Sequence, residues 1–121
     1  MEILIEARPQ YLFTKFAGPF TYSFASAGFK QVAEATEKHK CSRVLIDVTG
    51  LTGEIGIMDL HDLGVELAAL QKYFTRIAML VRPDQLLPDR FMQNVVRNRG
   101  LDGTGFVDLS EAEAWLTNTS D

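Results

Sequence analysis

The apolar positions along the chain change their spacing several times, and each change predicts a new element. Residues 2–7 and 10–17 are short runs rich in β-branched and aromatic side chains, separated by an Arg-Pro dipeptide. Because proline cannot donate a hydrogen bond to a strand ladder, these runs predict an antiparallel hairpin with Pro9 in its turn. The following dipeptide, Gly18-Pro19, is expected to end the second strand.

From Thr21 to His39 the apolar residues recur at every third or fourth position, which predicts an amphipathic helix. Gly28 lies inside this helix, where glycine costs about 1 kcal/mol relative to alanine. We therefore expect another part of the chain to approach Gly28 closely.

Beyond this helix, continuous apolar runs alternate with helical patterns. The runs at 43–48 and 76–81 predict strands that are buried on both faces of a parallel sheet, and residues 103–107 predict a short last strand. Between the first two runs lies the clearest helical stripe of the chain. It consists of Leu60, Leu63, Leu67, Leu70 and Phe74.

Two further helices are predicted near the C-terminus. One has Pro88 in its first turn and ends at Gly100, and the other opens with a capping box at Ser110–Glu113. The order of elements predicts an α/β fold, with one mixed, mostly parallel sheet of about five strands, an N-terminal antiparallel hairpin and about four helices. Residues 1–121 are expected to form a single domain, in which residues 117–121 are a frayed polar tail.

Composition and charge exclude several classes of protein. The net charge of −4 and the sequence pI near 5.1 argue against a nucleic-acid-binding protein, which usually carries a basic face. Cys41 is the single cysteine, so neither an intrachain disulfide nor a cysteine metal site is expected. The chain has no run of apolar residues long enough to cross a bilayer and no signal-peptide pattern at residues 1–9, so we expect a cytoplasmic protein.

Four stretches of the chain are similar in sequence and in order to segments of a known protein family. The first is VLIDVTGLTGEIGIMDLHDLG, followed by RIAMLV, VVRNRG and FVDLSEAEAWL. In this order they resemble the STAS domains, and more closely the SpoIIAA-like group of small bacterial proteins. The resemblance implies a STAS fold and a non-enzymatic regulatory protein that binds a partner protein. Because some SpoIIAA-like proteins also resemble CRAL-TRIO lipid-binding domains, it also implies an apolar ligand as the alternative.

The classical members of this family are switched by phosphorylation of a serine at a helix start, in a motif that reads roughly Asp-Ser-Ser-Gly-Leu-Gly. The matching residues here begin at Asp59, and Asp59, Leu63 and Gly64 agree with the motif. The serine positions hold Leu60 and His61 instead. The resemblance therefore implies partner binding without the usual serine switch, with His61 at the phosphoacceptor-equivalent position.

His61 and the carboxylates around it have both a chemical and a structural interpretation. A neutral imidazole close to Asp59 and Asp62 could act as a base or phosphoacceptor. We favour a solvent-facing His61, because the apolar stripe runs through Leu60 instead. Aspartates also suit a helix start, and no ligand spacing accompanies them, so neither a metal nor a cofactor is predicted.

The stretch between the buried strand and the leucine-rich helix is unusual, because it mixes apolar residues with glycines. Leu86 and Leu87 follow the next parallel strand and should lie at the same edge of the sheet. An exposed apolar rim there would suit a protein or a lipid tail, whereas folding inward as a lid on the core is slightly favoured. The candidate binding residues are Thr49, Leu51, Thr52, Ile55, Ile57, Met58, Asp59, His61, Leu86 and Leu87.

Three hypotheses follow from these patterns. The first is a partner-binding module that uses the 49–62 loop and helix start, and the second is a protein that binds a lipid-like molecule, with transient membrane contact. The third is a small hydrolase or phosphotransfer enzyme that uses His61. An apolar rim that encloses a cavity favours the second hypothesis over the first, and a His61–carboxylate pair inside a cleft favours the third.

Overall fold

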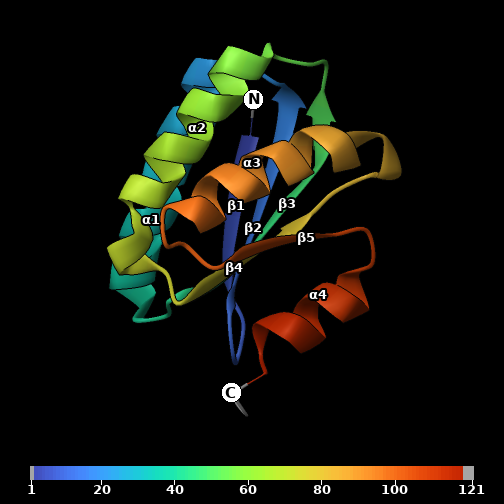
Figure 1. The fold of residues 1–121 in the computed structure, drawn as a ribbon. Coiled ribbons are helices and arrows are strands. Elements are labelled where there is room, and N and C mark those ends of the chain that lie inside the picture. The colour runs from blue at the N-terminus through green and yellow to red at the C-terminus, as the bar shows by residue number, and fades with distance from the viewer. Residues whose placement is uncertain (1, 119–121) are drawn as a thin grey trace.

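Residues 2–118 are described by the computed structural model, and their five strands form one sheet (Figure 1). The strands are β1 (Glu2–Ala7), β2 (Leu12–Pro19), β3 (Arg43–Thr52), β4 (Arg76–Leu80) and β5 (Gly103–Phe106). Their spatial order is β1-β2-β3-β4-β5, and β1 pairs with β2 in antiparallel fashion while the other pairs are parallel. The helices are α1 (Tyr22–His39), α2 (Ile57–Ala69), α3 (Leu86–Asn98) and α4 (Leu109–Leu116), with short 3₁₀ turns η1 (Gln71–Tyr73) and η2 (Pro83–Gln85). The predicted fold class is therefore confirmed.

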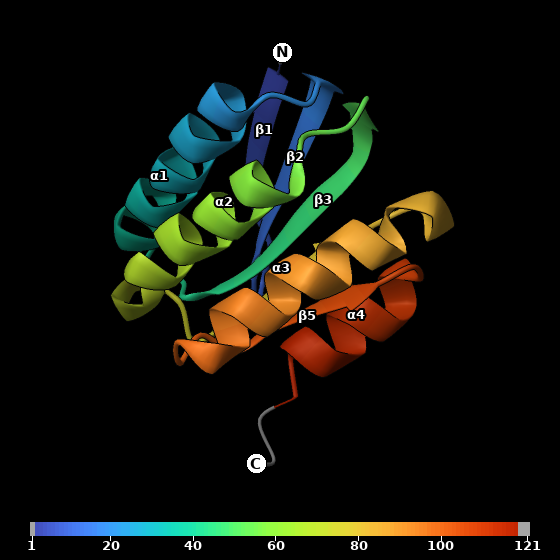
Figure 2. The same cartoon turned by 45° about the horizontal axis from the view of Figure 1, so that its top comes forward.

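The strand order determines where the helices lie. Each of the connections β2-α1-β3, β3-α2-β4 and β4-α3-β5 moves one strand further in the same direction. Right-handed crossovers that all move in one direction place their helices on the same face of the sheet. α1, α2 and α3 lie on that face, and α4, which follows the last strand, covers the other one (Figures 1 and 2).

The strand β4 shows how the sheet serves two cores. Ile77 and Met79 face the three-helix side, while Ala78 and Leu80 belong to the cluster under α4. Alternation of side chains along a strand produces this division, and it explains why the central strands have almost continuous apolar sequences.

Gly28 of α1 lies against the ring of Phe16 on β2. A Cβ atom at this position would approach the Phe16 ring to 2.8 Å and the Ile3 side chain to 3.1 Å. The close approach predicted from the sequence is present, and the missing side chain allows α1 to lie directly on the hairpin.

Two predicted strand boundaries were wrong, and both errors have one cause. β2 continues through Gly18 and Pro19, and β3 continues to Thr52 instead of ending at residue 48. Gly18 pairs with Leu51 and Pro19 pairs with Thr52. The two extensions are stabilised by each other, so a reading of either segment alone misses them.

Three predicted helix boundaries also need correction. α2 begins at Ile57, two residues before Asp59, and ends at Ala69, so the last two residues of the leucine stripe, Leu70 and Phe74, lie beyond it as the caps of η1. The N-cap of α4 is Asp108, whose carboxylate accepts a hydrogen bond from the Glu111 amide at 3.0 Å, and the predicted Ser110 cap is wrong. Of the predicted tail, residues 119–121 lie outside the described residues.

Within residues 2–118, none of the helices is both long enough and apolar enough to cross a lipid bilayer.

Candidate functional site: an apolar cavity between α2 and α3

The middle of α2 touches the C-terminal part of α3, and the two helices separate toward their N-terminal ends (Figure 2). The contact is at Gly64, where a Cβ atom would lie 2.8 Å from Cγ1 of Val95. Gly64 is one of the residues that match the STAS motif, and here its role is to let α3 approach α2. The separation beyond this contact leaves space over the carboxyl ends of β3 and β4.

A cavity of about 530 Å³ occupies this space and opens to the surface. Its size is within the range of small-molecule sites, which is roughly 300–1,000 Å³. Most of its walls are apolar. Among the lining residues are Phe16, Phe20, Phe29, Val48, Leu60, Leu63, Met79, Val81, Phe91 and Met92.

The predicted binding residues divide into two groups around this cavity. Leu51, Ile55, Ile57 and Leu87 line it. The others lie outside its walls; they are Thr49, Thr52, Met58, Asp59, His61 and Leu86. The structure therefore brings together four of the six apolar residues of the prediction and none of its polar residues.

The apolar residues of the 51–58 stretch do not share one environment. Leu51 is only 4% exposed and belongs to the core, whereas Ile57 and Met58 are 62% and 71% exposed in the first turn of α2. Leu87, at the start of α3, is 79% exposed. We call Ile57, Met58 and Leu87 the apolar rim, because they stand at the N-terminal ends of the two helices that border the cavity.

The mouth of the cavity is braced by η2. The guanidinium group of Arg82 donates to the backbone oxygens of Thr49 and Leu51, the latter at 3.0 Å, and its remaining nitrogens contact the carboxylate of Asp84. These hydrogen bonds from Arg82 lower the pKa of Asp84 below its ordinary value. The side chain of Gln85 donates to the Val48 oxygen at 2.9 Å, so the end of β3 is held from two positions.

Asp89 in the first turn of α3 is the most unusual polar residue of the site. Its Oδ2 atom is buried, and within residues 2–118 it has no hydrogen-bond partner. Burial raises the pKa of Asp89 to about 7, although the nearby charge of Arg90 opposes the shift. The carboxyl group therefore keeps a proton at a pH where most aspartates are fully ionised.

The polar residues that the sequence singled out have local roles. The buried carboxylate of Asp47 accepts hydrogen bonds from the amide and the hydroxyl of Thr49, at 2.8 and 2.6 Å. His61 lies 3.4 Å from Asp62, and the two side chains are 43% and 57% exposed. His61 thus has a carboxylate neighbour on the protein surface and does not line the cavity.

No group of three His, Cys, Asp or Glu side chains in the described part of the chain is arranged to hold a metal ion.

Sequence reasoning missed most of the cavity wall and also Asp89. The wall residues come from α1, α2, α3 and three strands, and each of them is an ordinary core residue in its own element. Asp89 follows Pro88 near a helix start, where an aspartate is already expected for its favourable interaction with the helix dipole. Only the arrangement in space distinguishes it.

Comparison with known proteins gives no match in sequence, either to a family model or to a curated protein. The fold is similar to that of a solved structure titled "Crystal Structure of an Anti-sigma Factor Antagonist from Mycobacterium paratuberculosis". The TM-score is 0.64 and the sequence identity is 12%, with 97% of this chain and 94% of the other covered. The chain therefore shares the fold of this structure, and this agrees with the STAS fold that the sequence resemblance implies. In this STAS fold the segment that matches the serine motif is the first part of α2, directly beside the cavity mouth.

Proposed function

We propose that this chain is a non-enzymatic regulatory module that binds a partner protein through the apolar rim and the adjoining 49–62 segment. The observation that carries the proposal is the exposure of Ile57, Met58 and Leu87 at one edge of the sheet. Apolar residues that gather on the surface are typical of interaction sites. The structurally similar protein is an anti-sigma factor antagonist, which supports a regulatory role exerted on another protein.

The proposed module works without a phosphorylated serine. Leu60 occupies one serine position and is 8% exposed among the core residues, while His61 occupies the other. Neither residue offers a hydroxyl group to a serine kinase. The exposed pair of His61 and Asp62 lies outside any cavity wall, which also argues against the hypothesis of a catalytic histidine.

The rim can be tested with charged substitutions that suit their positions. Ile57→Asp and Met58→Asp place acidic groups in the first turn of α2, where the helix dipole favours them, so the fold should remain stable. Leu109→Asp makes the same change in the first turn of α4, on the opposite side of the sheet, and is the matched control. Leu109 is 42% exposed.

The measurement is affinity purification from cells of the source organism with quantitative mass spectrometry, followed by titration of the recovered protein against each variant. The expected result is a protein that binds the unmodified chain and Leu109→Asp equally, and binds the Ile57→Asp/Met58→Asp chain at least tenfold more weakly. Equal binding to both variants would contradict the assignment of the contact surface.

A second function, binding of an apolar small molecule, is favoured by the cavity itself. An apolar rim that leads into a cavity of about 530 Å³ is the geometry expected for a small-molecule site, and a flat rim would have been sufficient for a protein partner. The walls are dominated by aliphatic and aromatic side chains, so the ligand class is lipid-like.

Native mass spectrometry of freshly purified protein tests this second function. A bound species of a few hundred daltons that dissociates on mild activation is the expected result. A mass equal to that of the chain alone, together with no fluorescence response from the apolar dye Nile red, would contradict it.

A further inference from the structure

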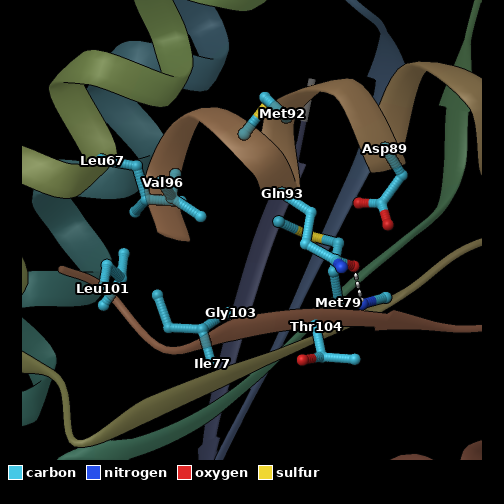
Figure 3. A pocket seen from close by; sticks show the side chains of 11 residues that line it. Leu67, Ile77, Met79, Asp89, Met92, Gln93, Val96, Leu101, Gly103 and Thr104 are labelled. Carbon is cyan, nitrogen blue, oxygen red and sulfur yellow. Dashed lines mark hydrogen bonds between the residues drawn. The ribbon is translucent and has the colours of Figure 1, made fainter. Parts of the chain in front are cut away.

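The carboxyl group of Asp89, whose Oδ2 atom has no hydrogen-bond partner within residues 2–118, lies in the wall of the cavity. Asp89 lines both the large cavity and a small one of about 20 Å³ that lies beneath α3 (Figure 3). Its side chain extends from α3 toward the sheet, among the apolar side chains of Met79 and Met92 (Figure 3). A polar group in such surroundings is costly unless it forms a hydrogen bond.

The backbone of β5 makes room for this carboxyl group without pairing with it. A Cβ atom on Gly105 would lie 1.8 Å from Oδ2 of Asp89, so any other residue at this position would force the Asp89 side chain to move. The backbone amide of Gly105 is already used, because it donates to Oε1 of Gln93 at 2.9 Å. The carboxyl group of Asp89 thus lies against β5, while the Gly105 amide donates its hydrogen bond to Gln93.

Charges around the cavity indicate which head group it can accept. Glu54 and Asp84 line the mouth, and the one basic residue among the lining residues, Arg82, is engaged by Asp84 and by backbone oxygens. A carboxylate ligand would therefore meet negative charge without a free cation. An ammonium ligand would require a buried ion pair, whose desolvation cost cancels much of the attraction.

An uncharged hydroxyl group meets these constraints. It donates to Asp89 when the carboxyl group is ionised and accepts from it when the carboxyl group is protonated. We propose that the cavity binds an uncharged, hydroxyl-bearing apolar molecule, whose hydroxyl group pairs with Asp89 while its apolar part extends toward Phe16 and Phe20. This inference rests on the second proposed function and adds the head group and the residue that recognises it. The raised pKa of Asp89 is consistent with it, because both protonation states are then available near neutral pH.

Isothermal titration calorimetry with ten-carbon probes tests the proposal. The probes are n-decanol, its methyl ether, n-decylamine and sodium decanoate. At pH 8, where Asp89 is mostly ionised and can only accept, the unmodified chain should bind n-decanol about five- to tenfold more tightly than the ether, which cannot donate, as expected for one net hydrogen bond. The amine and the carboxylate should bind more weakly than the alcohol.

Variants identify the responsible residue. Asp89→Leu should abolish the preference for the alcohol over the ether, and Asp89→Asn, whose amide group can donate to the oxygen of either probe, should reduce it. Asp84→Asn is the matched control at the exposed mouth and should retain the preference. Circular dichroism of each variant verifies the fold.

Each other outcome has a definite meaning. Equal binding of n-decanol and its ether would overturn the inference and leave the apolar cavity standing, with a water molecule in the small cavity as the partner of Asp89. Tighter binding of n-decylamine than of n-decanol would overturn it in favour of a cationic ligand. If none of the probes binds, the second proposed function fails, and the inference fails with it.

Discussion

The two faces of the sheet are filled to different degrees. Beneath α4, Tyr11, Leu45, Ala78, Ala112 and Leu116 form a small core, and the last four are fully buried. Beneath α1, α2 and α3 the core is larger but contains a cavity of about 530 Å³. The same strands supply both faces, so the difference arises from the helices.

Polar contacts strengthen this contrast. The α4 face is held at its edges by a hydrogen bond from the Tyr11 hydroxyl to Glu113 and by one from Arg76 to the Trp115 oxygen at 2.7 Å. The Arg76 guanidinium also stacks on the Trp115 ring at 4.5 Å. On the cavity face, Oδ2 of Asp89 is buried and has no hydrogen-bond partner within residues 2–118. The polar groups at the edges of the α4 face are therefore paired within the chain. The face under α1, α2 and α3 contains a cavity and an unpaired carboxyl oxygen that a ligand can contact.

The largest expected effect is on the α4 face. Leu116→Ala removes a fully buried side chain from the core under α4, so the free energy of unfolding should fall by about 2–5 kcal/mol. Leu87→Ala, at the exposed rim, should change it by less than about 0.5 kcal/mol. Urea unfolding followed by circular dichroism measures both, and similar losses for the two variants would remove the distinction between the faces.

The substitution Asp89→Asn should change the free energy of unfolding by an amount that depends on pH, because it removes the unpaired carboxyl group. The pKa of Asp89 is about 7 in the folded chain and near 3.8 when unfolded, so the folded chain binds more protons between these values. Stability then falls as the pH rises from about 4 to about 7, and the asparagine variant escapes this loss. We expect it to be more stable than the unmodified chain by roughly 2–4 kcal/mol at pH 8 and equally stable at pH 4.

The measurement for this prediction is urea unfolding of both chains at the two pH values. A difference in stability that is the same at pH 4 and pH 8 would show that the carboxyl group is not held in its protonated form by burial.

A smaller effect compares the two faces at β4 and at the residue that follows it. Ala78→Val adds carbon atoms under α4, where Ala78 is fully buried, and should cost about 1–3 kcal/mol through overpacking. Val81→Leu adds one carbon atom at the cavity wall and should change stability by less than about 1 kcal/mol, because the added atoms enter open volume. Thermal unfolding of the pair distinguishes these results, and a larger loss for Val81→Leu would mean that the cavity is already closed in solution.

Local patterns in the sequence were sufficient to predict the elements and their order. The hairpin, the long first helix and the close approach at Gly28 all follow from spacing and from single-residue propensities. The strand ends at Pro19 and Thr52 could not be predicted, because each extension exists only through pairing with the other.

The candidate site was predictable only in part, for a similar reason. Leu51, Ile55, Ile57 and Leu87 stood out as apolar residues next to strand ends, and they do line the cavity. The cavity itself depends on the angle between α2 and α3, which follows from tertiary contacts such as the one at Gly64 and Val95. The burial of Asp89 depends on residues from other elements, so the sequence around Asp89 does not reveal it.

The central claim is that the three-helix face contains a cavity that a ligand can enter, whereas the α4 face does not. The most direct measurement is nuclear magnetic resonance of methionine and alanine methyl groups during titration with n-decanol. Met79 and Met92 line the cavity, Met58 stands outside its walls, and Ala112 lies under α4. The account predicts saturable shifts of the Met79 and Met92 methyl signals with little change at Met58 and Ala112. Shifts of equal size at all four positions, or none at Met79 and Met92, would contradict it.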